Sequence, residues 1–194
     1  ISNATTSGNV GLRNASFKLK GNKRSFKELN GDFSFYNNEL KIENFHGVIS
    51  RTDFLLNGYF RNILQYFLLP DQQLFINATA KSNLINLDQL LAEGNDENQS
   101  AIKNSQSETK DEYHLNLSSR LAFDLMLVAK ELRFRKFSAT SISGTLQLKE
   151  GQFSATNLSF NSMSGTAQAD LSLTENATNN FDLACNATIE NIDV

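Results

Sequence analysis

The segments LFINATA (residues 74–80) and LAFDLML (residues 121–127) place an apolar side chain at every second position. Successive side chains of a β-strand point to opposite faces, so this period predicts strands with one apolar and one polar face. The same alternation recurs at residues 33–35, 40–42, 115–117, 132–135, 146–148, 158–160, 171–173 and 181–183. Strands with one wet face are typical of antiparallel sheets.

We therefore expect a mainly β protein, with an antiparallel, strongly bent sheet (a trough or an open barrel) built from repeated strand meanders. Polar links at residues 36–39 and 149–151 predict hairpin turns. The 24 asparagines fit a chain with many turns, because Asn tolerates left-handed backbone angles. One or two short helices are expected: residues 63–69 before Pro70, and a helix through Leu91 capped by Asn86 or Asp88.

The strand pattern repeats along the chain. At one constant offset, Gly31 aligns with Gly144 and Asn44 with Asn157; beyond a link of unequal length the alignment resumes, with Leu74 on Phe181. Any two amphipathic hairpins align to some degree, but the shared Asn favours a true repeat. We expect three regions: a first β repeat unit (residues 1–92), an acidic flexible linker (93–112) and a second β repeat unit (113–194) truncated at its C-terminal end.

The predicted linker holds most of the net charge. Residues 93–112 carry six acidic and two basic side chains, a charge of −4, whereas the whole chain carries −3, which leaves about +1 for the rest. A polar, low-complexity segment of this kind does not bury enough apolar surface to fold. The nearly neutral remainder argues against nucleic acid as a partner.

The composition gives little support for catalysis. One cysteine and two histidines leave no set of metal ligands or nucleophiles, so no catalytic residue, metal site, cofactor or enzymatic activity is expected. His46 and His114 have no Cys, Asp or Glu at ligand spacing. Cys185 follows the apolar alternation of its strand and is expected to be a buried small hydrophobe. No apolar run approaches the roughly 20 residues that cross a bilayer.

Two basic clusters are candidates for contact with anionic lipid headgroups. Lys18 and Lys20 belong to the first, and Arg133 and Arg135, which alternate with apolar residues, belong to the second. The alternative is a solvated sheet face whose charges protect an edge strand.

The 15 Phe residues, with no Trp, are the most suggestive feature of the composition. In a closed barrel or sandwich the apolar faces would bury one another, whereas in a trough they would line a groove suited to acyl chains. Alternation alone does not separate these two arrangements. The candidate groove residues are Phe33, Phe35, Leu40, Ile42, Phe54, Leu56, Leu74, Ile76, Leu146, Leu148, Phe153, Leu158 and Leu171.

Several motifs carry a family resemblance. The segments LNGDFSF (29–35), LKIENFHG (40–47), DFLLNG (53–58) and INLDQLL (85–91) form a theme to which FNSMSG (160–165) and NIDV (191–194) are similar. This theme resembles the AsmA-like family, which is related to TamB and to the eukaryotic bridge-like lipid-transfer proteins. The high Asn and Phe content without Trp resembles the Bacteroidetes branch.

The resemblance implies a piece of a large cell-envelope protein of Gram-negative bacteria, without catalytic residues. An N-terminal helix outside this piece would anchor the full-length protein in the inner membrane, and the β repeats would lie in the periplasm. Such proteins are implicated in lipid transport or outer-membrane assembly, so we expect lipid binding along an apolar β groove. The alternative is a structural or protein-interaction β module with a closed, packed core; protein partners are not identified by the sequence.

Overall fold

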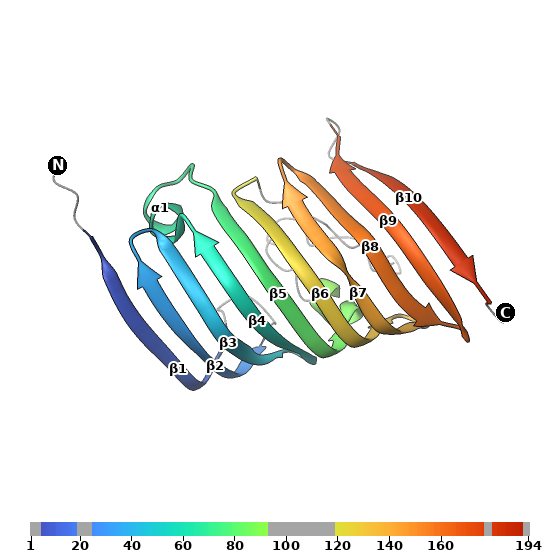
Figure 1. The fold of residues 1–194 in the computed structure, drawn as a ribbon, viewed down its shortest axis with the longest axis horizontal. Coiled ribbons are helices and arrows are strands. Elements are labelled where there is room, and N and C mark those ends of the chain that lie inside the picture. Colours follow the sequence, from blue (N-terminus) through green and yellow to red (C-terminus); the bar gives the residue numbers. More distant parts are fainter. Residues whose placement is uncertain (1–4, 19–24, 93–118, 177–179, 192–194) are drawn as a thin grey trace, which may run out of the picture.

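The computed structural model describes residues 5–18, 25–92, 119–176 and 180–191. They form ten strands and two short helices (Figure 1). The elements of the N-terminal half are β1 (Ser7–Lys18), β2 (Ser25–Tyr36), β3 (Glu39–Ile49), β4 (Thr52–Arg61), α1 (Ile63–Leu68), β5 (Leu74–Asn86) and α2 (Leu87–Ala92). Those of the C-terminal half are β6 (Leu121–Phe134), β7 (Phe137–Lys149), β8 (Gln152–Ser162), β9 (Gly165–Glu175) and β10 (Phe181–Glu190).

All ten strands belong to one curved sheet whose spatial order follows the sequence from β1 to β10 (Figure 1). Every neighbouring pair is antiparallel except β5 and β6, which run parallel. The sheet does not close into a barrel, and the expected mainly β, bent architecture is confirmed. We call β1–β5 with the two helices the first unit and β6–β10 the second unit.

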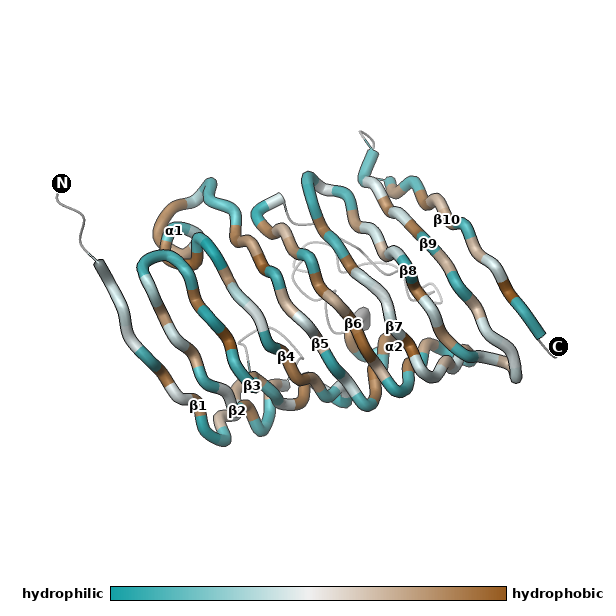
Figure 2. The backbone as a smooth tube through the Cα atoms, viewed as in Figure 1, coloured by the Kyte–Doolittle hydropathy of each residue, from teal (hydrophilic) through white to brown (hydrophobic). Residues whose placement is uncertain are grey.

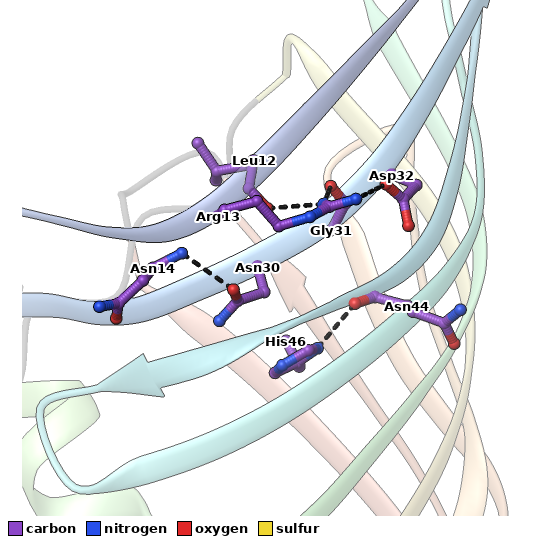
Figure 3. A network of polar contacts seen from close by, with 8 residues as sticks. All are labelled: Leu12, Arg13, Asn14, Asn30, Gly31, Asp32, Asn44 and His46. Carbon is purple, nitrogen blue, oxygen red and sulfur yellow. Dashed lines mark hydrogen bonds and ion pairs between the residues drawn. The ribbon is translucent and has the colours of Figure 1, made fainter.

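Bulges interrupt the strand pairing and help the strands to bend, because an extra residue on one strand kinks it. At three of these bulges the backbone is left-handed at Asn14, Asn44 and Asn157, which have φ values of 48°, 52° and 51°. A side chain from the next strand accepts a hydrogen bond from the backbone amide at each one. Figure 3 shows this for Asn14, whose amide lies 2.9 Å from Oδ1 of Asn30.

The backbone repeats at the offset found in the sequence, the one that aligns Gly31 with Gly144. Left-handed φ values occur in the first unit at Glu28, Asn37, Asn44 and Ser50. They occur again at the four residues that this offset makes equivalent, Ser141, Glu150, Asn157 and Met163. Most residue types avoid this conformation, so its recurrence shows that the two units share backbone geometry as well as pattern. The boundaries of the units at residues 92 and 113 stay a prediction.

Both predicted helices are present. α1 ends just before Leu69, close to Pro70, and its first turn is preceded by Asn62 in the left-handed region. Arg120 holds the end of α1, since its guanidinium donates to the carbonyl oxygen of Tyr66 at 2.7 Å and lies 4.5 Å from the centre of that ring. At α2 the cap is Asn86, whose Oδ1 accepts from the amide of Gln89 at 3.1 Å.

One strand prediction is wrong at its last residue, and two further predictions concern residues that the structure does not describe. The alternation predicts Arg135 on a strand beside Arg133, but β6 ends at Phe134 and Arg135 lies in the following turn with a φ of 54°. The alternation continues one residue past the strand because the turn happens to start with a polar residue. The predicted strand at residues 115–117 and the predicted linker at 93–112 lie outside the described residues.

Candidate functional site: the apolar face of the sheet

Strand pairing assigns every side chain to one of the two faces of the sheet. Residues directly opposite each other on neighbouring strands share a face, so a line of such partners forms a row across the sheet. Row A consists of Gly8, Phe35, Leu40, Phe60, Ile76, Phe123, Leu148, Phe153, Leu173 and Leu183. Row B consists of Val10, Phe33, Ile42, Gly58, Ala78, Leu125, Leu146, Ala155, Leu171 and Cys185.

Rows A and B contain no charged residue, and they lie two residues apart along each strand, so they share one face. We call this the apolar face. The row between them belongs to the opposite face and is almost entirely polar: Asn9, Ser34, Lys41, Tyr59, Asn77, Asp124, Gln147, Ser154, Ser172 and Ala184. Figure 2 shows the resulting alternation of hydrophobic and hydrophilic segments along the strands.

All the groove residues selected from the sequence lie on the apolar face. Rows A and B hold most of them. Leu56 and Leu158 belong to the row beside row B, Phe54 to the one beyond it, and Leu74 to the row on the other side of row A. The sequence analysis missed other members of this face, among them Phe60, Phe123, Leu125, Leu173 and Leu183. The same period-two signal would have found them, because they occupy the same parity in strands already recognised.

Burial is concentrated on the apolar face. With the exception of Ala122, the buried hydrophobic residues point to it: Leu29, Ile42, Leu74, Ala78, Ala129, Ala139, Ile142, Leu148, Ala155 and Ala167. A core cluster forms where Ala129, Ala139 and Ile142 meet the partly buried Ile85 and Leu132. No large side chain of the described residues is fully buried, so most of the face is only partly covered.

In the first unit the apolar face is aromatic. The rings of Phe33, Phe45 and Phe54 follow one another, with centroids 5.4 Å and 5.1 Å apart and tilted or edge-on geometry. Glycines make room beside them. At Gly31 an added Cβ would lie 3.0 Å from Cα of Phe45, a tight contact that glycine avoids.

Three of the four predicted headgroup residues lie near one margin of the sheet, and the fourth lies outside the described residues. β1 and β6 run in the same direction, so Lys18 and Arg133 lie near the same margin of the sheet, where Arg135 forms the β6–β7 turn. Arg133 already pairs with Glu131 at 2.6 Å, and this ion pair raises the pKa of the guanidinium. Lys18 is exposed, and Lys20 lies outside the described residues.

The remaining candidates for chemistry are dispersed. His46 is exposed, and its Nδ1 lies 2.8 Å from the carbonyl oxygen of Asn44 (Figure 3). The expected burial of Cys185 is wrong: it is exposed, because β10 is the last strand of the sheet and no strand among the described residues covers its outer side. His114 lies outside the described residues. Within the part of the chain that the structure describes, no three His, Cys, Asp or Glu residues come together as a metal site.

Asp53 is the most strongly hydrogen-bonded carboxylate of the first unit. It accepts hydrogen bonds from the amides of Asn83 and Leu84 at 2.8–3.0 Å and from the side chains of Ser82 and Asn83. Partial burial pushes the pKa of Asp53 up, but the hydrogen bonds outweigh it, so the pKa lies below its ordinary value. Asp53 therefore fixes the irregular end of β5 against β4, which is a structural role.

Shallow hollows lie over the polar face. One of about 750 Å³ is bordered by Asp53, Lys81, Val128 and Lys130, and another of about 700 Å³ by Asp170 and Asn186. Both are wide open; the first is bordered by charges of both signs, whereas among the described residues Asp170 is the one charged residue that borders the second. The apolar face instead offers a long, continuous strip, which suits an extended apolar ligand better than a compact one.

Comparison with family models, curated proteins and solved structures finds no match to this chain. The fold and the apolar face are thus the basis for any functional conclusion. Among the described residues, no helix has the length and apolar character needed to cross a bilayer.

Proposed function

We propose that this chain binds lipid acyl chains along its apolar face and acts without catalysis, as a piece of an AsmA-like cell-envelope protein. The observation that carries the proposal is the unbroken apolar strip of rows A and B across ten strands. Soluble proteins rarely leave an apolar surface of this extent open, and such surfaces usually mark a partner.

The dimensions of the strip fit hydrocarbon. Strands lie roughly 4.8 Å apart, so ten strands span about 43 Å across the sheet. The hydrocarbon core of a bilayer is about 30 Å thick, so each leaflet contributes about 15 Å, and the strip is long enough for more than one acyl chain placed end to end. Burial of hydrocarbon is non-directional, so a chain would lie along the strip without specific contacts.

The polar parts of a lipid would stay at the margins. Lys18 and Arg135 lie at one margin of the sheet, where anionic headgroups would meet basic side chains and water. Arg133 contributes less, because Glu131 already neutralises it.

The wider assignment follows from the resemblance of the strand motifs. The chain would belong to a Gram-negative envelope protein whose β repeats lie in the periplasm, with an inner-membrane anchor outside these 194 residues. Lipid homeostasis or assembly of the outer membrane would be the process served. The open sheet supports this reading over a module with a closed, packed core.

The test is lipid binding by a matched pair of variants. Leu56 lies on the apolar face and its neighbour Leu55 on the polar face, between His46 and Lys81 on the adjacent strands. Leu56→Glu places a charge among acyl chains and should reduce both co-purified phospholipid, measured by mass spectrometry, and binding of a fluorescent fatty acid. Leu55→Glu, with the same added charge on the other face, should retain both.

Circular dichroism would verify that both variants are folded. The proposal fails if the unmodified protein, stripped of lipid, binds neither a fluorescent fatty acid nor phospholipid vesicles, or if the two variants lose binding equally.

A further inference from the structure

The short helix α1 presents its apolar side to the outside of the molecule. Leu64, Phe67 and Leu68 are spaced so that they share one face of the helix, and they are 42 %, 75 % and 76 % exposed. Leu69, directly after the helix, is 49 % exposed. An ordinary surface helix turns its apolar stripe toward the core, so the orientation of α1 is reversed. Figure 2 shows α1 as a brown, hydrophobic segment at the margin of the sheet.

The opposite side of α1 is held to the sheet by polar contacts. Asn38, in the turn between β2 and β3, donates from its side-chain amide to Oδ1 of Asn62 at 2.9 Å and to Oε1 of Gln65 at 2.7 Å. Near the other end, Arg120 donates to the carbonyl oxygen of Tyr66 at 2.7 Å. The helix is therefore fixed at both ends, with its apolar face left outside.

The strand meander does not require this apolar segment. α1 lies in the connection from β4 to β5, residues 62–73, whereas the equivalent connection from β9 to β10 consists of residues 176–180, with the sequence NATNN. There the amide of Asn176 donates to the carbonyl oxygen of Asn180 at 2.8 Å, so a short polar connection joins an equivalent pair of strands. The exposed Leu and Phe side chains of α1 are thus an addition that the sheet itself does not need.

We propose that α1 inserts its apolar face into the surface of a phospholipid bilayer. A helix that lies at the membrane interface buries its apolar side chains at the boundary between headgroups and acyl chains. Residues 62–70 contain no charged side chain, so no charge leaves water together with them. Four side chains anchor a protein only weakly, as a single acyl chain does, so the contact is reversible.

The ends of α1 already have hydrogen-bond partners for this environment. A helix leaves unpaired amides at its start and unpaired carbonyl groups at its end, and such groups are costly in hydrocarbon. The amide of Leu64 donates to Oδ1 of Asn38 at 3.3 Å. Arg120 donates to the carbonyl oxygen of Leu69 at 3.3 Å as well as to that of Tyr66. These partners lower the cost of moving the helix ends out of water.

A bilayer fits this patch better than a protein partner does. A stable protein interface buries roughly 800 Å² on each side. The four side chains of the patch are 42–76 % exposed, and even an aromatic side chain buries at most about 250 Å², so together they fall short of that area. A bilayer needs no matching shape, because burial of hydrocarbon is non-directional.

The position of α1 relates the bilayer contact to the apolar face. Phe60, a member of row A, is followed by Arg61 at the end of β4 and then by the connection that holds α1. A lipid that leaves the bilayer beside α1 would therefore meet row A. This use of the contact rests on the proposed function, whereas the contact itself does not.

The first test is flotation of the full 194-residue chain with an excess of vesicles made of phosphatidylcholine alone. Phe67→Ser combined with Leu68→Ser should lower the partition coefficient at least about tenfold, because two side chains no longer bury hydrocarbon. The control combines Met126→Ser and Val128→Ser, which remove two exposed apolar side chains from the polar face, and it should float like the unmodified protein. An unmodified protein that does not float, or equal loss in both double variants, would overturn the proposal.

A second measurement separates this contact from lipid binding along the strip. The α1 double variant should still bind a fluorescent fatty acid, whereas Leu56→Glu should lose the fatty acid and still float. If no form of the protein binds the fatty acid but flotation depends on α1, the proposed function fails and the bilayer contact stands. If fatty-acid binding is intact but flotation does not depend on α1, the reverse holds.

Insertion can also be observed directly. In a Cys185→Ser background, Leu69→Cys would carry an environment-sensitive fluorophore, and Met126→Cys would carry the same label on the polar face. With vesicles, the label at position 69 should shift to the blue and be quenched by brominated acyl chains, while the label at position 126 should do neither. A floating protein whose label at position 69 is not quenched would show that another surface binds the bilayer, and the proposal would be wrong.

Discussion

The first and second units share a backbone but differ in part of their lining, although Phe123 and Phe153 are also in ring contact on the apolar face of the second unit. Phe33, Phe45 and Phe54 on the apolar face of the first unit form an aromatic series. At the offset that aligns Gly31 with Gly144, their equivalents are Leu146, Leu158 and Ala167. A few backbone-determining positions evidently suffice to specify the meander, because cores tolerate exchange of apolar side chains when the pattern is kept.

The bulges show the same division between fixed and variable parts. In the first unit the amide of Asn44 is held by Oδ1 of Asn57 at 2.8 Å, and in the second the amide of Asn157 is held by Oδ1 of Asp170 at 2.7 Å. The left-handed Asn is kept, while its partner changes from an amide to a carboxylate. What the backbone requires is therefore an acceptor at this place, whether neutral or charged.

The sharpest contrast between the units is at row B, where Gly58 corresponds to Leu171. A Cβ at Gly58 would lie 2.6 Å from Cα of Ala78 and would collide with the carbonyl oxygen of Asn77. Gly58→Leu should therefore reduce the free energy of unfolding by about 3 kcal/mol, measured by urea denaturation. Gly8→Leu is the control, because nothing lies within 4 Å of a Cβ there, and its effect should be small. Similar losses in both would refute the steric explanation.

Asp53 corresponds to Thr166, so its carboxylate is a feature of the first unit alone. Asp53→Asn should cost about 2 kcal/mol, since a hydrogen-bonded charge is replaced by a group that presents donors to donors. The lowered pKa of Asp53 stabilises the folded state above the ordinary pKa of Asp, and this contribution is lost as the pH falls through the folded value. Denaturation between about pH 5 and pH 2 should thus show a weaker pH dependence in the variant. An unchanged pH profile would argue against the role of Asp53.

Substitution of the side chains that accept hydrogen bonds from the bulge amides should have a smaller effect on stability, and a similar one in both units. Asn57→Ala and Asp170→Ala each remove one acceptor from a bulge amide and should each cost about 1 kcal/mol in chemical denaturation. Asp170→Asn converts the second unit to the arrangement of the first and should be nearly neutral. A large loss in Asp170→Asn would mean that the negative charge, rather than the acceptor, is needed.

The smallest effect is expected from exchanging the lining. Phe45→Leu gives the first unit the residue found at position 158 of the second and should cost about 0.5–1 kcal/mol, through lost contacts with the two neighbouring rings. Thermal unfolding followed by circular dichroism would measure it. A loss as large as that of Gly58→Leu would show that the aromatic series is part of what specifies the unit.

Much of the fold was predictable from sequence because the sheet has one apolar face, and period two therefore marks nearly every strand. The parallel pair β5–β6 was not predictable, since a strand alternates in the same way whichever direction its neighbour runs. The burial of Cys185 was predicted wrongly because alternation tells which face a residue lies on but not whether its strand is at an edge. The candidate groove residues could be predicted because they are the apolar positions of the same period-two pattern that identifies the strands.

The parallel step between β5 and β6 has a consequence for symmetry. Each unit has five strands, an odd number, so its last strand points the same way as its first, and the parallel step makes the second unit a shifted copy rather than an inverted one (Figure 1). The two margins of the sheet that the strand ends form therefore stay distinct along its whole length. α1 lies at one margin, and α2 and the turn at Arg135 lie at the other. The sheet therefore has a direction from β1 to β10. A molecule lying along it has two non-equivalent orientations that the protein itself can distinguish.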